Sequence, residues 1–120
     1  MPRVVHFEFG ADNPERAAKF YRDVFNWKIE SYPGPTEYLL VDTGKEDMGI
    51  NGAITKRQKD WDISNTIGVE SVDEYIERIE MHGGEVITEK MTIPGIGYMA
   101  YFKDTEGNII GIIEPDMSAK

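Results

Sequence analysis

Two side chains that can exchange protons lie two residues apart near the start of the sequence. His6 and Glu8 belong to the run "VVHFEF", in which apolar and polar residues alternate. This alternation predicts a β-strand with both polar side chains on one face. Histidine titrates near neutral pH and a carboxylate can orient its ring, so the pair could transfer a proton or hydrogen-bond a ligand. The alternative is that both simply lie on a solvated sheet face or at a dimer interface.

Aromatic side chains are the next candidates, because ligand pockets are mostly apolar with a few polar groups. Those that could line a pocket are Tyr38, Trp61, Tyr98 and Phe102. Whether Tyr98 and Phe102 face the pocket depends on the pairing register of the final hairpin. Pairing of Lys103 with Asn108 would put both on the pocket face and Tyr101 on a helix, whereas a different turn length would reverse this. Ordinary packing is the alternative for each aromatic residue.

The surrounding sequence predicts the elements that hold these side chains. After the first strand, Asn13 is a good N-cap and Pro14 suits the first helical position. Strand-like runs follow at 27–32, 37–44 and 48–54, separated by Pro and Gly turns. The second half repeats this order, with a strand at 64–70, a helix at 71–84 and strands at 85–91, 98–104 and 108–114.

This repeat predicts an α+β fold of two βαβββ modules. The first module covers residues 1–55, the second covers 63–115, and residues 56–62 form the linker. A chain of 120 residues fits one domain of this kind.

The composition excludes several classes of function. The net charge of −9 argues against partners such as nucleic acid and anionic membranes. The basic run "TKRQK" at 55–59 is best interpreted as a solvated linker. With no cysteine, disulfides, thiolate metal sites and cysteine catalysis are excluded. We see no apolar run of about 18 residues that could span a bilayer and no signal peptide, so a cytoplasmic location is the default expectation.

Three stretches together carry a family resemblance. They are "H-x-x-x-x-x-x-N-P-E-R-A-A-K-F-Y-R-D-V-F-N-W" from His6 to Trp27, "V-E-S-V-D-E" followed by "G-G", and "F-K-D-T-E-G-N-I-I-G". Their order and spacing resemble the vicinal oxygen chelate superfamily, also called the glyoxalase, bleomycin-resistance and extradiol dioxygenase family. The resemblance covers essentially the whole chain. It implies curved sheets that close around a funnel with the helices outside, often built from two chains of a homodimer.

The resemblance also implies where metal-dependent members place four ligands, on the first and last strands of each module. The matching positions are, in chain order, His6, Asn51 or Gly52, Ser64 with Asn65 adjacent, and Gly111. Only His6 is a usual ligand, and Glu8 beside it would still leave too few. Glu114 lies an odd number of residues from Gly111 and should face the other way. We therefore expect no cofactor, and a divalent metal only if one is recruited in an unusual way.

Three functions remain open from the sequence. The first is a metal-free homodimer that binds a small organic molecule, with Tyr38, Asn51, Trp61, Tyr98 and Phe102 as ligand contacts. The second is a lyase or isomerase of the lactoylglutathione lyase type that uses His6 with Glu8, or a recruited divalent metal. A third, less specific possibility is a structural or regulatory dimer without a ligand.

The segment "IPGIGY" at 93–98 has two interpretations. It could be a mobile lid with glycine hinges over the funnel mouth, or a turn between two strands. It lacks the G-x-G-x-x-G spacing of a dinucleotide-binding loop, so we expect no nucleotide there.

Overall fold

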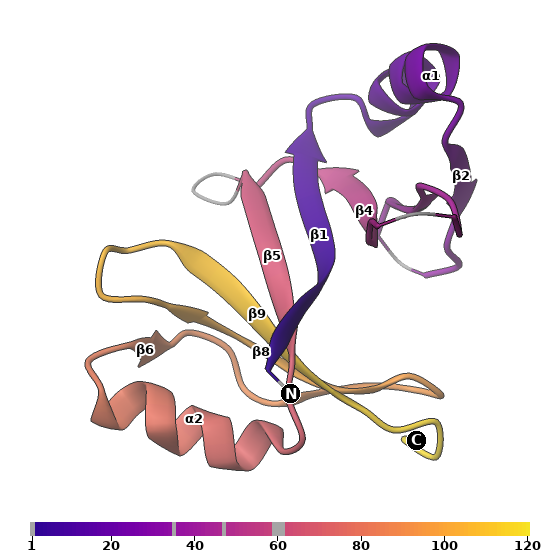
Figure 1. Cartoon of the computed structure of the whole chain (residues 1–120). Coiled ribbons are helices and arrows are strands. Elements are labelled where there is room, and N and C mark those ends of the chain that lie inside the picture. Colours follow the sequence, from indigo (N-terminus) through magenta and orange to yellow (C-terminus); the bar gives the residue numbers. More distant parts are fainter. Residues whose placement is uncertain (1, 35, 47, 59–61) are drawn as a thin grey trace. The chain divides into compact units, whose positions relative to one another are not determined.

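The computed structural model describes residues 2–34, 36–46, 48–58 and 62–120. These residues form two compact units (Figure 1). We call residues 6–64 the first unit, and residues 1–5 with 65–120 the second unit. The α+β class and the repeated order of a strand, a helix and further strands are confirmed. The division into modules 1–55 and 63–115 stays a prediction, as does the funnel.

In the first unit, four strands form a sheet with one helix against it. Its elements are β1 (Arg3–Ala11, from His6 on), α1 (Pro14–Phe25), β2 (Lys28–Ser31), β3 (Tyr38–Asp42) and β4 (Asn51–Lys56). The strand order is β2-β3-β4-β1. Strands β1 and β4 are parallel, whereas the β2–β3 and β3–β4 pairs are antiparallel.

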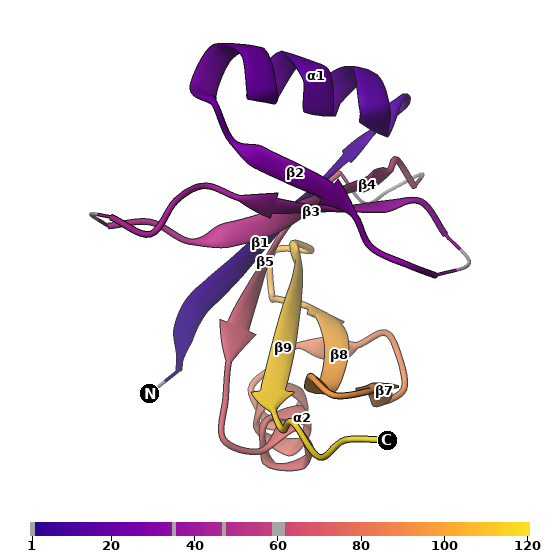
Figure 2. The ribbon, with the colours of Figure 1, turned by 90° about the vertical axis from the view of Figure 1, so that its right-hand side faces the viewer.

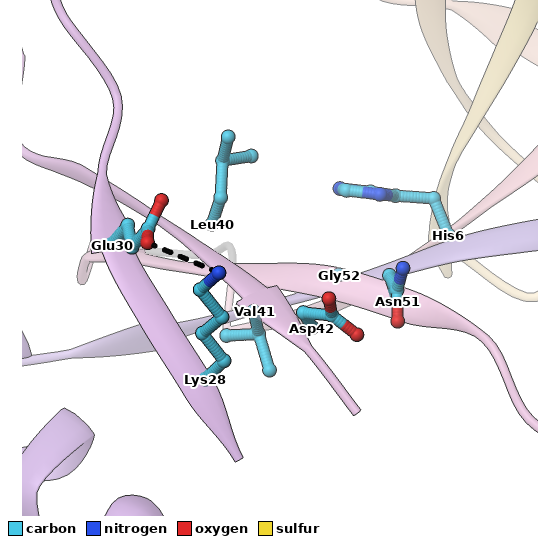
Figure 3. Close-up of a pocket in the computed structure, with 8 residues that line it drawn as sticks. All are labelled: His6, Lys28, Glu30, Leu40, Val41, Asp42, Asn51 and Gly52. Carbon is cyan, nitrogen blue, oxygen red and sulfur yellow. Dashed lines mark ion pairs between the residues drawn. The ribbon is translucent and has the colours of Figure 1, made fainter. Parts of the chain in front are cut away.

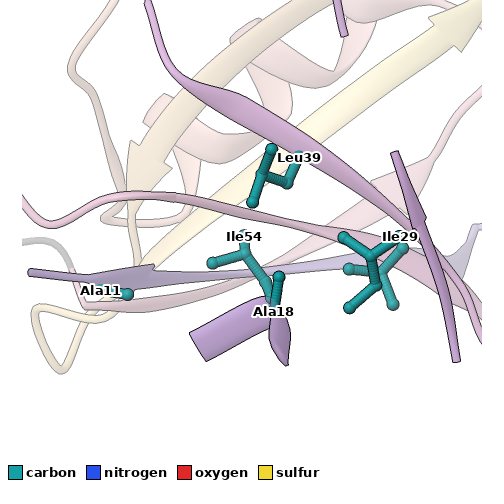
Figure 4. Packing of buried hydrophobic residues seen from close by; sticks show 6 residues of the cluster. Ala11, Ala18, Ile29, Leu39 and Ile54 are labelled. Atoms are coloured by element: carbon teal, nitrogen blue, oxygen red, sulfur yellow. The ribbon is translucent and has the colours of Figure 1, made fainter. Parts of the chain in front are cut away.

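Helix α1 begins where its sequence predicts. The Asn13 side chain accepts a hydrogen bond from the backbone N of Arg16 at 3.0 Å, and Pro14 follows at the first position. The helix ends at Asn26, whose left-handed backbone (φ 60°) stops the helical repeat. Its buried Ala18 packs against Leu39 and Ile54 of the sheet (Figure 4).

In the second unit, the strands also lie against one helix. Its elements are β5 (Ile63–Gly68, from Asn65 on), α2 (Val72–Met81), β6 (Glu85–Val86), β7 (Met91–Ile93), β8 (Gly97–Lys103) and β9 (Ile109–Pro115). The strand order is β5-β9-β8-β6, and β7 also pairs with β8. Helix α2 lies beside β8 and β9 (Figure 1, Figure 2), with Val72, Ala100 and Ile112 in the shared core.

The strand predicted at 85–91 is split into β6 and β7. Between them, the backbone N of Ile87 donates to the Tyr101 carbonyl at 2.9 Å. The next donor on β8, the Tyr101 N–H, binds the Thr88 hydroxyl oxygen at 2.9 Å instead of a backbone carbonyl. A side-chain acceptor thus takes the place of a ladder bond, and the regular strand is interrupted.

The predicted pairing of Lys103 with Asn108 is wrong by one residue, because Lys103 pairs with Ile109. Asp104 sets the turn: its carboxylate accepts from the backbone N of Glu106 and of Asn108, at 2.8 and 2.9 Å. Its own backbone N donates to the Asn108 carbonyl, so the loop has the form of a three-residue hairpin, with Gly107 at φ 82°.

This shift reverses the faces of the β8 side chains. Tyr98 and Phe102 pack against the core beneath α2. Tyr101 lies on the opposite face, next to Gly111.

Candidate functional site

Three polar side chains of the first unit meet on the sheet face that lies away from α1. Phe7 and Phe9 pack in the core with α1, so alternation turns His6 and Glu8 to the other face. Leu40 of β3 and Glu8 of β1 both lie opposite Ala53 of β4, and Tyr38 is two residues before Leu40. We call the face that carries His6, Glu8 and Tyr38 the polar face.

A hydrogen-bond chain joins these three residues. The His6 Nε2 and the Tyr38 hydroxyl oxygen are 3.3 Å apart. The Tyr38 hydroxyl also bonds the Glu8 carboxylate. A hydroxyl has one hydrogen, so when it donates to an ionised Glu8 its oxygen must accept from His6 Nε2–H. With Glu8 ionised, the network therefore places the proton of neutral His6 on Nε2 and leaves Nδ1 as an acceptor.

Burial shifts the titration of both ionisable groups. It lowers the pKa of His6, because a buried imidazolium loses hydration. Burial also raises the pKa of Glu8, and the hydrogen bond from Tyr38 opposes part of that rise in pKa. Since each shift favours the neutral form, His6 is an uncharged imidazole at neutral pH.

A cavity of about 300 Å³ lies on this side of the first unit (Figure 3). Its lining residues are His6, Lys28, Glu30, Leu40, Val41, Asp42, Asn51 and Gly52. The Lys28 ammonium lies 3.6 Å from the Glu30 carboxylate, and both side chains are about 70% exposed (72% and 70%). An exposed pair of this kind contributes little stability and can rearrange around a ligand.

The structure brings together only some of the site residues predicted from sequence. His6, Glu8 and Tyr38 are in one network, and Asn51 lines the cavity. Asn51 has a structural contact as well, because its Oδ1 accepts from the backbone N of Thr43 at 2.9 Å.

The remaining predicted contacts do not join this cluster. Trp61 lies outside the described residues. Tyr98 and Phe102 belong to the second unit and face its core, so the face argument that favoured them no longer holds.

Sequence reasoning missed Val41 and four other cavity residues, which are Lys28, Glu30, Leu40 and Asp42. Two of them had a usable signal, since Leu40 and Asp42 follow Tyr38 at even steps along one strand. The other two lie on β2, and their place depends on the pairing of Lys28 with Asp42, which no local pattern predicts.

The residues at the implied metal positions do not fit a four-ligand site. A Cβ on Gly111 would lie 2.9 Å from the Met99 methyl, 3.0 Å from Thr66 Oγ1 and 3.1 Å from the Tyr101 ring, so other side chains already fill that space. A Cβ on Gly52 would collide with the Phe7 carbonyl oxygen. Across the described parts of the chain, no group of three or more His, Cys, Asp and Glu side chains could hold a metal ion.

Glu114 does not replace the missing ligand. Its Oε1 accepts a hydrogen bond from the backbone N of Val72 at 3.0 Å, at the start of α2. As expected from the odd step along β9, the Glu114 carboxylate lies on the α2 side of the strand, whereas Gly111 faces the other way.

The segment 93–98 is a turn between β7 and β8. The Ile96 N–H bonds the Ile93 carbonyl, and two further backbone bonds tie the turn to the last residues of the chain: Gly95 N to Ala119 O and Asp116 N to Ile96 O. Of the two interpretations of this segment, the structure agrees with a turn between two strands.

In the described part of the basic run at 55–59, two side chains bind nearby acidic or backbone groups. Arg57 pairs with Asp12 at 3.2 Å and with Asp62 at 2.7 Å, and the Lys56 ammonium donates to the Asp12 carbonyl. Within the described residues, neither helix is long and apolar enough to cross a membrane.

Comparisons with known proteins bear on the family. A curated glyoxylase-like domain-containing protein of Didymella fabae is 28% identical over 113 residues, which cover 88% of each chain. The anthracycline biosynthesis protein DnrV of Streptomyces peucetius is also 28% identical, over 84% of this chain. The chain covers only 42% of that relative's length.

Solved structures show the same fold at low sequence identity. A hypothetical protein from Bacillus halodurans superposes with a TM-score of 0.75 and 14% identity, over 99% of this chain and 98% of its own. A methylmalonyl-CoA epimerase from Mycobacterium tuberculosis gives 0.70 and 14%, over 94% and 87%.

The family model for the Glyoxalase/Bleomycin resistance protein/Dioxygenase superfamily matches residues 3–112. This match confirms the resemblance carried by the three sequence stretches. The chain belongs to the Glyoxalase/Bleomycin resistance protein/Dioxygenase superfamily.

Proposed function

We propose that the chain binds a small organic molecule, without a resident metal, in the cavity on the polar face of the first unit. The observation that carries this proposal is the half-buried chain of His6, Tyr38 and Glu8, in which His6 also lines a cavity of about 300 Å³. Small-molecule sites combine a cavity of this size with a few placed polar groups.

The family supports a small-molecule ligand in general terms. One relative, DnrV, is named an anthracycline biosynthesis protein. The donor set supports the metal-free part of the proposal, because His6 and Glu8 alone are too few for a stable divalent site.

A second candidate function is a lyase or isomerase in which His6 moves the proton. The observation that favours it is the assigned tautomer, since an unprotonated Nδ1 on a neutral imidazole is a competent general base. Glu8 and Tyr38 would hold the ring and would stabilise the imidazolium that forms. This scheme needs only these three side chains and the substrate.

We also propose that the chain works as a homodimer in the cytoplasm. The family resemblance supports the dimer, and the absence of cysteine suits a reducing compartment.

A screen of small organic molecules by isothermal titration calorimetry would test the proposal. We expect a ligand for the wild-type chain whose affinity falls at least about tenfold in His6→Ala, because a polar contact is lost. His82→Ala is the matched control, since it removes the other histidine, at the exposed end of α2. Equal binding by wild type and His6→Ala would contradict the site.

The same variants separate a binder from an enzyme. A binder retains its ligand unchanged. For an enzyme, His6→Ala would abolish turnover while leaving the thermal transition in place, and normal turnover in that variant would remove His6 from the mechanism.

A further inference from the structure

The hydrogen-bond chain on the polar face restricts what kind of ligand can bind. We propose that this site recognises a hydrogen-bond-donating group, a hydroxyl or an amine on a neutral or cationic molecule, and disfavours carboxylates. This inference rests on the proposed function, because it names the ligand class of the same cavity.

The first step concerns His6. Its Nε2 is committed to Tyr38, whose own hydrogen goes to Glu8. Among the residues that the structure describes, none makes a hydrogen bond to Nδ1 of His6. The ring nitrogen left for a ligand therefore carries a lone pair, and a lone pair requires a donor from the ligand.

The second step concerns the other polar groups of the cavity. Asp42 and Glu30 both contribute carboxylates to the lining, and these only accept hydrogen bonds when ionised. One Asp42 oxygen accepts from the backbone N of Gly44 at 2.9 Å, which leaves the second oxygen with acceptor capacity. The cavity thus has at least three acceptor groups, on His6, Asp42 and Glu30, against two donor groups, the Lys28 ammonium and the Asn51 amide NH2.

The third step concerns charge. Among the described residues that line the cavity, Lys28 is the only cationic side chain, and it lies 3.6 Å from Glu30. With His6 neutral, two carboxylates face one ammonium, so the lining is net negative. The whole chain carries a net charge of −9, which adds to the repulsion of an anion.

The test uses three probes with one ring and different polar groups, namely benzylamine, benzyl alcohol and benzoate. Each is titrated into the full-length ¹⁵N-labelled chain at pH 7.5 and followed through backbone amide shifts. We expect benzylamine and benzyl alcohol to shift amides of β1, β2 and β3 in the first unit, and benzoate to bind about tenfold more weakly than the amine, as a charge repulsion at close range predicts.

Two variants isolate the causes. Asp42→Asn keeps an oxygen that can accept from the Gly44 backbone N and removes the negative charge. The variant should therefore reduce the difference in affinity between benzylamine and benzoate. Asp23→Asn, on the exposed side of α1, is the control and should leave this difference unchanged.

Tyr38→Phe tests the tautomer directly. Imidazole ¹⁵N spectra should show His6 protonated at Nε2 in the wild type and a mixture of tautomers in the variant, with weaker benzyl alcohol binding. A purely structural role for Tyr38 would leave the tautomer unchanged.

The outcomes are distinguishable. Tighter binding of benzoate at these same amides would overturn the ligand class and leave the proposed site intact. No shift by any of the three probes would overturn the proposed site, and the ligand class with it.

Discussion

The first and second units repeat one order of elements, yet the sheet faces that lie away from their helices carry different residues. In the first unit that face holds His6, Glu8 and Tyr38 beside a cavity. In the second unit it holds Gly111, with Met99 and Tyr101 packed over the space a side chain would occupy. This comparison shows that the scaffold alone does not make a site. The polar groups depend on which residues occupy a few positions on that face of the sheet.

Substituting one glycine in each unit would sharpen this comparison most strongly. Gly52→Ala should destabilise the chain by roughly 3 kcal/mol or more, because its Cβ would meet the backbone oxygen of Phe7, which cannot move without breaking the sheet. Gly111→Ala should cost about 1–2 kcal/mol, because the nearest atom is the mobile Met99 methyl. The measurement is the free energy of unfolding in urea.

Gly34→Ala is the control for this pair. Apart from its chain neighbours, no atom of the described residues lies within 4 Å of its Cβ position, so the change should stay within about 0.5 kcal/mol. If Gly52→Ala were as stable as Gly34→Ala, the close approach of β4 to Phe7 would be wrong.

Glu114→Ala probes the second unit, where a carboxylate serves the fold rather than the polar face. The variant should lose about 1.5 kcal/mol, because the backbone N of Val72 at the start of α2 loses a charge-assisted partner. Glu114→Gln retains an acceptor oxygen and should lose less. Chemical denaturation of both variants checks this, and equal losses would show that the hydrogen bond is not the cause.

The pH dependence of His6 probes the first unit. Its pKa is lowered by burial, so the unfolded chain takes up the proton near pH 6.5 while the folded chain takes it up only at lower pH. Stability should therefore fall as the pH drops through this window, and His6→Gln should remove that slope. Imidazole NMR gives the same pKa directly, with His82→Gln used to assign the two histidines. A His6 midpoint above 6.5 would contradict its burial.

Glu8 should show the opposite dependence. Because burial raises its folded pKa above the reference value of 4.5, the folded chain holds the proton at a higher pH than the unfolded chain. Its contribution to stability should rise as the pH falls from the folded pKa towards 4.5. Comparing pH-dependent melting of wild type and Glu8→Gln isolates this contribution, and identical slopes would remove Glu8 from the buried network.

Local patterns in the sequence predicted the parts of this fold that depend on nearby residues. The cap Asn13 accepts the expected backbone bond, and alternation correctly turned His6 and Glu8 away from α1. These features depend on spacing within one element, which the sequence contains directly.

The parts that could not be predicted depend on contacts between elements. The one-residue shift of the last hairpin comes from Asp104 and its bonds to Glu106 and Asn108, which a general turn rule does not specify. The contact of Tyr38 with His6 needs β4 between β3 and β1, and that strand order is a property of the sheet. The site follows the same division: the shared face of His6 and Glu8 was predictable, whereas the hydrogen bonds that Tyr38 makes to them and the cavity were not.

The central claim is that the polar face of the first unit is the binding surface. The most direct test is a protein-detected NMR fragment screen that maps shifted amides onto both units. We predict that shifts gather on β1, β2, β3 and β4 around His6, Tyr38 and Asn51, and that His6→Ala removes them. Shifts gathered instead around Gly111 on β5, β8 and β9, and unaffected by His6→Ala, would contradict the claim.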